Sequence, residues 1–341
     1  MPTIFLSAGE ASGEHYGALL IESILRLAPE AQFFGLGGQR MEALGLKRIV
    51  RAEDVAVMGI TEVVRYMPRI YGEYRRLKAS LQGGPGHSRP DVAVLIDFPD
   101  VNLRLARSLH RLGIPVIFFV SPQLWAWKKR RIRRVKRYVD RMLVIFPFEE
   151  TFYRERGVQA DFVGHPLANL PLPTITREQF AEENALDPAR RWIGLLPGSR
   201  PREIRLNLPE MLRAAANLKG EGGEKAEFLL PLAPTLTRPQ IRSIERLLQT
   251  ASVQARITLV NDARAALHHA RASIVASGTA TVEAAIIGNP FIVVYRLSRL
   301  SYAVARRVVK VPFVAMVNLV AGREVVPELI QDNFTAAKIV L

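Results

Sequence analysis

The sequence predicts an α/β protein made of two Rossmann-like, doubly wound domains. Short apolar runs alternate with longer amphipathic ones along the 341 residues, a pattern typical of βαβ units and parallel sheets. A proline-rich linker, Leu167–Thr176, interrupts this rhythm, which restarts at Trp192. We therefore expect one domain at residues 1–168 and a second at 169–341. Their ligands should bind in a cleft that the two domains face, at the carboxyl ends of the strands.

The expected strands are the short apolar runs. In the first domain they are Ile4–Ser7, Gln32–Leu36, Val92–Asp97, Val116–Val120, Met142–Phe146 and Ala160–Val163. In the second domain they are Trp192–Leu196, Phe228–Leu232, Ile257–Val260, Ser273–Ala276 and Phe291–Tyr295. Between the strands, apolar residues at helical spacing predict helices such as Asn102–Leu112, which Gly113 ends.

Composition narrows the class of protein. The chain has no cysteine, which excludes disulfides and thiolate chemistry. The net charge is +15 and is shared by the two halves. An evenly basic protein favours anionic partners, namely nucleic acid, nucleotide-linked substrates or an acidic membrane surface.

The sequence can be searched for segments that would cross a membrane or lie against its surface. Residues 1–10 lack the basic leader of a signal peptide, and no uncharged apolar run reaches the ~18–20 residues of a spanning helix. Two stretches, Val63–Lys78 and Lys128–Arg141, mix apolar and aromatic residues with Arg and Lys. Such stretches are either solvated helix faces or membrane-facing surfaces. In the first stretch the residues predicted to face a membrane are Tyr66, Met67, Arg69, Ile70 and Tyr71.

Two turns of the second domain are candidate anion sites. Ser277-Gly278-Thr279 joins a strand to a short helix that Gly288 ends, and Gly198-Ser199-Arg200 follows the strand Trp192–Leu196. Free N–H groups and the positive end of a helix dipole suit a diphosphate. Arg200 would neutralise a leaving diphosphate, and Glu283 would accept hydrogen bonds from ribose. An ordinary capped helix and a surface turn are the alternatives.

The first domain carries the candidate acid–base residues. The loop from Gly9 follows the first strand, but it is not a dinucleotide fingerprint. Asp97 lies at a strand tip and suits a general base, whereas Asp100 suits a helix N-cap. A metal site made by the two aspartates lacks a third ligand nearby, so no metal is expected. Trp125 is either a core residue or a platform for a sugar ring.

Motifs along the whole chain resemble those of the lipid-A-disaccharide synthase family. They are Ser7–Gly13, Ile96–Asn102, Val120–Trp127, Phe146–Glu149, Gly164–Pro166, Leu196–Arg200, Ser277–Glu283 and Asn318–Glu324. The resemblance implies an inverting glycosyltransferase of the GT-B type that needs neither metal nor cofactor. It implies transfer of 2,3-diacylglucosamine from its UDP donor to 2,3-diacylglucosamine 1-phosphate (lipid X), which gives a β(1→6) disaccharide and UDP. It also implies a cytoplasmic protein, peripheral on the inner face of the inner membrane of Gram-negative bacteria.

The resemblance also implies a role for each residue of the site. Asp97 and Arg200 would be catalytic, although the motifs leave open whether Asp97 or Asp100 is the base. The acceptor-binding residues would be Gly9, Glu10, Ser12, Asp100, Asn102, Ser121 and Trp125. The UDP-binding residues would be Gly198, Ser199, Arg200, Ser277, Gly278, Thr279, Thr281, Glu283, Asn318 and Glu324.

The chain departs from the family in two places. Glu14 stands where the family usually has Asp. The sequence also stops at Leu341, inside a helix expected from Thr335, whereas relatives continue with helices that contribute to a homodimer.

Two other functions remain as alternatives. Another GT-B enzyme that uses a UDP-sugar, such as a peptidoglycan N-acetylglucosaminyltransferase or a UDP-GlcNAc 2-epimerase, would share the donor half. The motifs at Gly9–Gly13 and Ser121–Trp127 argue against it. A nucleic-acid-binding protein is suggested by charge only, and no specific nucleic-acid module is recognised.

Overall fold

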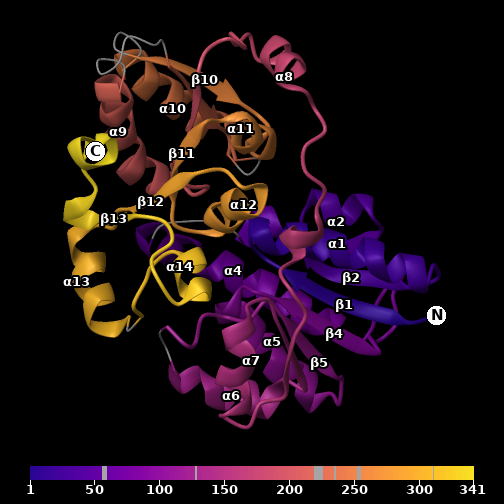
Figure 1. The fold of residues 1–341 in the computed structure, drawn as a ribbon. Helices are drawn as coiled ribbons and strands as arrows, with labels where there is room; N and C mark the ends of the chain where they lie inside the picture. The colour runs from indigo at the N-terminus through magenta and orange to yellow at the C-terminus, as the bar shows by residue number, and fades with distance from the viewer. Residues whose placement is uncertain (56–59, 127–128, 219–225, 234–235, 252–254, 310) are drawn as a thin grey trace. The chain divides into compact units, whose positions relative to one another are not determined.

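The computed structural model describes residues 1–55, 60–126, 129–218, 226–233, 236–251, 255–309 and 311–341. The chain divides into two compact units, Met1–Pro166 and Leu167–Leu341. In Figure 1, unit 1 runs from indigo to magenta, and unit 2 continues to yellow. Each unit is a sheet with flanking helices, as the sequence predicts.

Unit 1 is built on a seven-stranded parallel sheet with the order β3-β2-β1-β4-β5-β6-β7. Its strands are β1 (Thr3–Ala8), β2 (Gln32–Gly37), β3 (Leu46–Arg51), β4 (Val92–Ile96), β5 (Val116–Phe119), β6 (Arg141–Val144) and β7 (Ala160–Phe162). Its helices are α1 (Ala11–Leu27), α2 (Gln39–Ala43), α3 (Ala52–Val55), α4 (Ile60–Ser80), α5 (Pro99–Arg111), the 3-10 turn η1 (Lys129–Arg131), α6 (Ile132–Tyr138) and α7 (Pro147–Arg154).

Unit 2 repeats the plan with six parallel strands in the order β10-β9-β8-β11-β12-β13. Its strands are β8 (Trp192–Leu196), β9 (Glu227–Pro231), β10 (Arg256–Val260), β11 (Ala272–Ala276), β12 (Phe291–Tyr295) and β13 (Glu328–Ile330). Its helices are α8 (Arg177–Glu183), α9 (Pro201–Leu218), α10 (Arg238–Ala251), α11 (Ala263–His269), α12 (Thr279–Ile287), α13 (Arg299–Val308), α14 (Met316–Ala321) and α15 (Ala336–Val340), with 3-10 turns η2 (Pro166–Asn169) and η3 (Gln331–Asn333).

Burial explains why the central strands are continuous apolar runs. Every residue of β1 is buried, because helices cover both faces of a parallel sheet. On one face, Phe5 and Phe34 pack with Leu105 and Leu109 of α5 in a single core. The positions of Leu105 and Leu109, four residues apart, place both side chains on the same side of α5. This packing fixes α5, which carries Asp100 and begins two residues after Asp97.

The predicted fold class is confirmed, and every expected strand is present. Two strands, β3 and β13, were not expected from the sequence. β3 is at the edge of its sheet and carries Lys47, Arg48 and Arg51, so its sequence lacks the apolar run of a central strand. β13 has only three residues and includes Glu328. In the part of the chain that the structure describes, no helix is long and apolar enough to cross a membrane.

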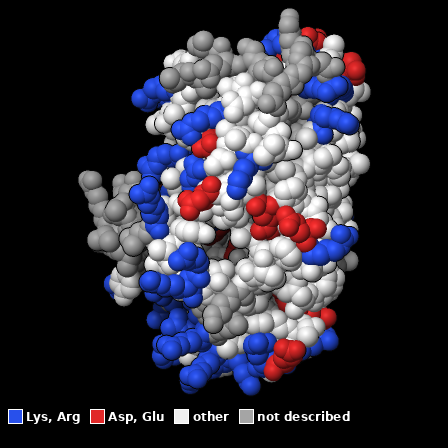
Figure 2. Space-filling view, turned by 60° about the vertical axis from the view of Figure 1, so that its left-hand side comes forward, with Lys and Arg blue, Asp and Glu red and all other residues white. Residues whose placement is uncertain are grey.

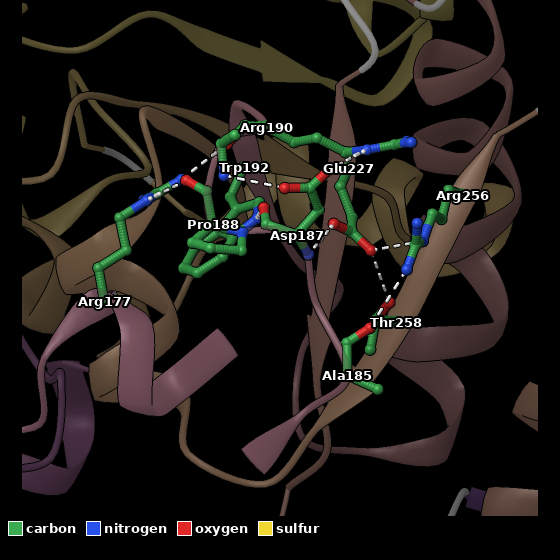
Figure 3. A network of polar contacts seen from close by, with 10 residues as sticks. Arg177, Ala185, Asp187, Pro188, Arg190, Trp192, Glu227, Arg256 and Thr258 are labelled. Atoms are coloured by element: carbon green, nitrogen blue, oxygen red, sulfur yellow. Dashed lines mark hydrogen bonds and ion pairs between the residues drawn. The ribbon is translucent and has the colours of Figure 1, made fainter. Parts of the chain in front are cut away.

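A polar network joins the amino ends of three strands in unit 2 (Figure 3). The fully buried Glu227, at the start of β9, accepts bonds from the Nε of Arg256 at 2.7 Å and the backbone N–H of Asp187 at 3.3 Å. The indole N–H of Trp192 donates to the carbonyl of Asp187 at 3.1 Å. The Arg177 guanidinium lies 3.7 Å from the centre of a Trp192 ring. Ligands bind at the carboxyl ends of the strands in such sheets, whereas this network lies at the amino ends. We therefore assign the network a role in the stability of unit 2.

Glu227→Ala is expected to lower the free energy of unfolding by about 2 kcal/mol, because it leaves the Asp187 N–H unpaired and removes the partner of Arg256. Urea unfolding of unit 2 measures the change. The exposed Glu245 of α10 gives the matched control, Glu245→Ala, which should be near neutral. Equal losses in the two variants would contradict a stabilising role for the network.

Candidate active site

The order of strands fixes where a ligand can bind in each unit. In unit 1 the connections reverse direction between β1 and β4, and in unit 2 between β8 and β11. Such switch points open a crevice at the carboxyl ends of the two adjacent strands. The polar turns that follow β1, β4, β8 and β11 are the ones singled out in the sequence. Each unit therefore has one candidate crevice of its own.

The backbone after β4 has an uncommon conformation. Asp97 and Phe98 have φ angles of 46° and 48°, in the left-handed region that few residues other than glycine adopt. The Phe98 ring is consequently placed over Gly9, which follows β1. A Cβ atom on Gly9 would lie 2.4 Å from Cδ1 of Phe98. The two strand ends are thus packed together through a glycine, and backbone strain of this kind is concentrated at functional sites.

Gly9→Ala is expected to displace Phe98 and, with it, Asp97. A displacement of about 1 Å at a reacting group costs on the order of 10²-fold in rate. The matched control is Gly13→Ala in α1, where the new Cβ would be 3.6 Å from the nearest atom. Transfer rates of the two variants, with circular dichroism to confirm folding, measure the difference. Equal activity in both would show that the contact with Phe98 is unimportant.

Asn102 of α5 fastens the two strand ends. It is fully buried, its Oδ1 accepts the Ser7 hydroxyl at 2.6 Å, and its Nδ2 donates to the Asp97 carbonyl at 2.7 Å. Nδ2 also lies 3.2 Å from the carbonyls of Ser7 and Ile96. With its amide bonded inside the unit, Asn102 positions Asp97, and its expected contact with the acceptor stays a prediction.

The two aspartates have different surroundings. Asp97 is partly buried, and its backbone N–H donates to the Phe119 carbonyl at 3.0 Å. Asp100 is 68% exposed and pairs with Arg131. The expectation that Asp100 caps α5 is wrong, because the helix begins at Pro99 and Asp100 lies within its first turn. Proline at the first helical position replaces the capped turn.

The loop after β1 leads directly into α1. Gly9 is buried, whereas Glu10 and Ser12 are partly exposed at the start of the helix. The Glu10 carbonyl accepts the N–H of Glu14 at 2.8 Å. The Glu14 carboxylate accepts the backbone N–H of Arg40 at 2.9 Å, at the start of α2. Glu14 therefore ties α1 to α2.

Glu149 is a functional candidate that the sequence analysis missed. Its side chain is 1% exposed, and its two carboxylate oxygens accept the Trp125 indole N–H at 3.0 Å and the Phe146 N–H at 3.2 Å. Burial raises the pKa of Glu149 to about 7. The available signal was the spacing of a capping box, with Glu149 three residues after the N-cap position of α7.

Ser121 was predicted to bind the acceptor, but the structure buries it. Its Oγ lies 2.8 Å from the hydroxyl of Tyr153 and donates to the carbonyl of Pro122 at 3.0 Å. The preceding Val120 has a φ of 62°, which is a strained value for a β-branched residue. Ser121 thus anchors the segment that carries Trp125, and its contact with the acceptor stays a prediction.

Aromatic rings surround Trp125 at the ends of β5 and β6. The Trp125 ring lies 5.1 Å from that of Phe148 in an edge-to-face arrangement, and Phe148 stacks on Phe146 at 5.9 Å. His165 lies 5.6 Å from Phe146 and 5.8 Å from Tyr16. Burial lowers the pKa of His165 to about 4, so its ring is neutral near pH 7. The partly exposed rings of Trp125 and Phe148 would suit a sugar face or an acyl chain.

In unit 2 the turn after β8 is held by Glu203. Gly198 has a φ of 113°, and a Cβ there would lie 2.6 Å from Oε2 of Glu203. The same oxygen accepts the Arg200 N–H at 3.4 Å, and the Arg200 guanidinium lies 3.6 Å from the carboxylate. The Arg200 side chain nevertheless remains 63% exposed. It is accessible to an anionic ligand.

The turn after β11 presents backbone groups. Gly278, at the N-cap position of α12, has φ 155° and ψ −162°, a conformation that essentially only glycine adopts. The Thr281 side chain is buried and its hydroxyl donates to the Gly278 carbonyl at 2.7 Å, while Ser277 Oγ donates to the Val314 carbonyl at 3.2 Å. Both hydroxyls thus shape the turn. The N–H groups and dipole of α12 are the elements of this turn that could bind an anion.

Two other residues predicted to contact UDP, Glu283 and Asn318, bond to groups of unit 2. Glu283 lies 3.4 Å from Arg264, and burial raises the pKa of this carboxyl while Arg264 opposes the shift. Asn318 is fully buried and accepts the N–H groups of Val325 and Val326 at 2.8 and 3.0 Å. Asn318 therefore positions its loop, and its contact with UDP stays a prediction.

The remaining candidates lie in different settings. Glu324 is exposed in the loop that Asn318 holds, and Ser199 and Thr279 lie in the exposed turns after β8 and β11. The side chains of Tyr66, Met67 and Arg69 are outside the described part of the chain. Farther along α4, Ile70 is partly exposed and Tyr71 is 60% exposed.

The sequence analysis also missed Asn207. This fully buried residue of α9 donates to the Pro197 carbonyl at 3.0 Å and accepts the Arg296 N–H at 3.0 Å. It fixes the end of β8 to the end of β12, much as Asn102 fixes strand ends in unit 1. The signal was an asparagine between Ile204 and Leu208, on the apolar face of a helix.

The surface of the protein is mainly basic. Lys and Arg side chains predominate over Asp and Glu on the face in Figure 2, which agrees with the net charge of +15. Within the described ranges, no group of three or more His, Cys, Asp or Glu side chains could hold a metal ion.

Comparisons with known proteins identify the relatives of this chain. A family model described as lipid-A-disaccharide synthetase matches residues 4–340. The chain is 68% identical to a lipid-A-disaccharide synthase of Acidobacterium capsulatum, covering 99% of this chain and 85% of the relative. It is 52% identical to that of Koribacter versatilis, covering 99% and 86%.

Solved structures of other enzymes share the fold. The calicheamicin glycosyltransferase CalG4 has a TM-score of 0.59 at 16% identity, covering 100% of this chain and 88% of that one. A UDP-GlcNAc 2-epimerase from Neisseria meningitidis, bound to UDP-GlcNAc, has a TM-score of 0.61 at 13% identity, covering 94% and 90%. At these identities the likeness shows a two-domain Rossmann-like GT-B fold.

Proposed function

This chain belongs to the lipid-A-disaccharide synthase family of glycosyltransferases, and on that premise we propose its substrates and the roles of its residues. The donor is UDP-2,3-diacylglucosamine and the acceptor is 2,3-diacylglucosamine 1-phosphate. The products are the β(1→6)-linked disaccharide 1-phosphate and UDP. Unit 2 binds the donor, and unit 1 binds the acceptor.

The observation that carries the donor assignment is the pairing of two turns on adjacent strands. β8 and β11 are hydrogen-bonded neighbours, with Leu196 opposite Val275, so the turns at Gly198 and Gly278 lie at the same edge of the sheet. One turn supplies the Arg200 guanidinium and the other the amino end of α12. Together they provide positive charge for the diphosphate of UDP.

The acceptor chemistry is assigned to Asp97. In a single displacement, an acceptor hydroxyl oxygen forms a bond to the anomeric carbon while the bond from that carbon to the UDP oxygen breaks. Asp97 takes the hydroxyl proton, and the electron pair leaves with UDP. Arg200 and the N–H groups of α12 stabilise the negative charge that grows on the leaving group. We propose that this stabilisation lets transfer proceed without a metal or another cofactor.

Measuring UDP release from two donors tests the function. UDP-2,3-diacylglucosamine should support rapid release in the presence of acceptor, and UDP-glucosamine without acyl chains should support little. Comparable release from both donors would argue against an enzyme specific for acylated sugars.

Membrane docking and assembly form the remaining part of the proposal. The basic residues around the exposed Tyr71 of α4, together with the net charge, support binding to an anionic membrane, on the inner face of the inner membrane. Flotation with anionic vesicles at low and high salt tests this, since loss of binding at high salt is expected and no binding at either would refute it.

The family resemblance supports a homodimer, and monomeric sedimentation would refute that assembly.

A further inference from the structure

Trp125 is expected to contact the acceptor, whereas its partner Glu149 has no assigned role in the proposed reaction. Trp125 lies in the segment after β5, and Glu149 lies in the first turn of α7, which follows β6. β5 and β6 are adjacent parallel strands, so both residues belong to the carboxyl edge of the sheet in unit 1. This is the edge at which Asp97 follows β4.

Ionised Glu149 is costly to bury. The groups that favour its charged form are neutral donors, namely the Trp125 indole and the backbone N–H of Phe146. Because burial raises the folded-state pKa above the unfolded value, this carboxyl contributes most stability below its unfolded pKa and loses that contribution as pH rises through about 7. A buried carboxylate that costs stability when ionised is a candidate for a role in function.

The hydrogen bonds of the Glu149 carboxylate hold the Trp125 ring in place. One oxygen accepts the Trp125 indole N–H at 3.0 Å, and the other accepts the Phe146 N–H at 3.2 Å. The bond to Trp125 fixes the rotation of the indole, while Phe148 packs edge-to-face against the ring at 5.1 Å. The partly exposed ring is therefore held in one orientation by a fully buried acid.

We propose that the Glu149 carboxylate positions the Trp125 indole as a platform for the acceptor sugar, an inference that rests on the proposed transferase function. Glu149 is a positioning residue, since it acts through Trp125 and does not touch the substrate. Its ionised form supplies acceptors to both N–H donors, whereas the protonated acid presents an O–H to one of them. The platform is consequently well ordered above neutral pH and loosened below it.

Other titratable groups near Glu149 do not change their charge between pH 5.5 and 8.5. Tyr153 lies one turn along α7, and burial raises the pKa of its hydroxyl further above neutrality. His165 packs against Phe146 at 5.6 Å, and burial lowers the pKa of its ring to about 4. Between pH 5.5 and 8.5, Glu149 is therefore the member of this group that titrates.

The test follows the indole N–H of Trp125 by ¹⁵N NMR, with the resonance identified by its absence in Trp125→Phe. In the wild type its proton shift should titrate with a midpoint near pH 7, moving to higher field as the pH falls. Glu149→Gln should abolish this titration. The matched control is Glu150→Gln, because Glu150 bonds Arg154 at 2.9 Å and the Phe162 N–H at 3.2 Å instead. That variant should titrate like the wild type.

Kinetics provide the functional readout. Glu149→Gln should raise the KM for the acceptor by about tenfold and change kcat by less than about twofold, with UDP affinity unaltered. An unchanged titration in Glu149→Gln, or an unchanged acceptor KM, would overturn the proposal. Should Glu149→Gln fail to fold, the wild-type resonance still decides, since a shift that stays flat from pH 5.5 to 8.5 refutes the proposed ordering of the ring by ionisation of Glu149. A wild type that transfers no sugar would refute the proposed function, and the indole titration would remain a separate result.

Discussion

Asp97→Asn is expected to lower the rate of transfer by about 10²–10⁴-fold, because an amide cannot accept the proton of the acceptor hydroxyl. The substitution suits this test because asparagine tolerates the left-handed backbone observed at residue 97. The bond from Asn102 goes to the backbone carbonyl of residue 97 and is therefore retained. UDP affinity should be unchanged, since the proposed donor site lies in unit 2.

Asp100→Asn is the matched control for this prediction. Asp100 is largely exposed and paired with Arg131, so the control should keep most of the wild-type rate. Turnover at saturating substrate and UDP binding by calorimetry measure both variants. If Asp100→Asn lost activity and Asp97→Asn retained it, the roles of the two aspartates would be exchanged.

Arg200→Ala is expected to reduce kcat by about 10²–10³-fold at every pH from 6 to 9, because the guanidinium stays charged throughout and opposes the charge on the leaving UDP. Arg200→Lys should recover only part of the loss, since an ammonium cannot form the paired bonds of a guanidinium. EDTA or added Mg²⁺ should have little effect on the wild type.

The exposed Arg205 of α9 supplies the control, since Arg205→Ala removes the same charge without touching the turn after β8. Initial rates of UDP release compare the variants. Inhibition of the wild type by EDTA, reversed by a divalent ion, would contradict stabilisation by Arg200 and the end of α12.

The sequence was most informative where burial is complete. A strand such as β1 is buried along its whole length, so its apolar run identifies it directly. β3 was missed because an edge strand can carry charges such as Lys47 and Arg48. The helix expected from Asn102 begins at Pro99, because the left-handed Asp97 and Phe98 turn the chain before proline starts the helix.

The turns of the candidate site could be predicted, but the direction of each side chain could not. Asn102, Thr281 and Asn318 are polar residues near strand ends, and each is buried and bonds to backbone. Sequence alone does not distinguish a polar group that binds a ligand from one that satisfies buried backbone. Glu149 was missed because an acidic residue in the first turn of a helix usually interacts with the dipole at the surface.

Product analysis tests the proposed transfer of 2,3-diacylglucosamine to its acceptor. The protein would be incubated in EDTA with UDP-2,3-diacylglucosamine and 2,3-diacylglucosamine 1-phosphate, and the products followed by mass spectrometry and NMR. We expect UDP and a β(1→6)-linked disaccharide 1-phosphate in equal amounts. An α linkage, or an epimerised sugar with no disaccharide, would contradict it.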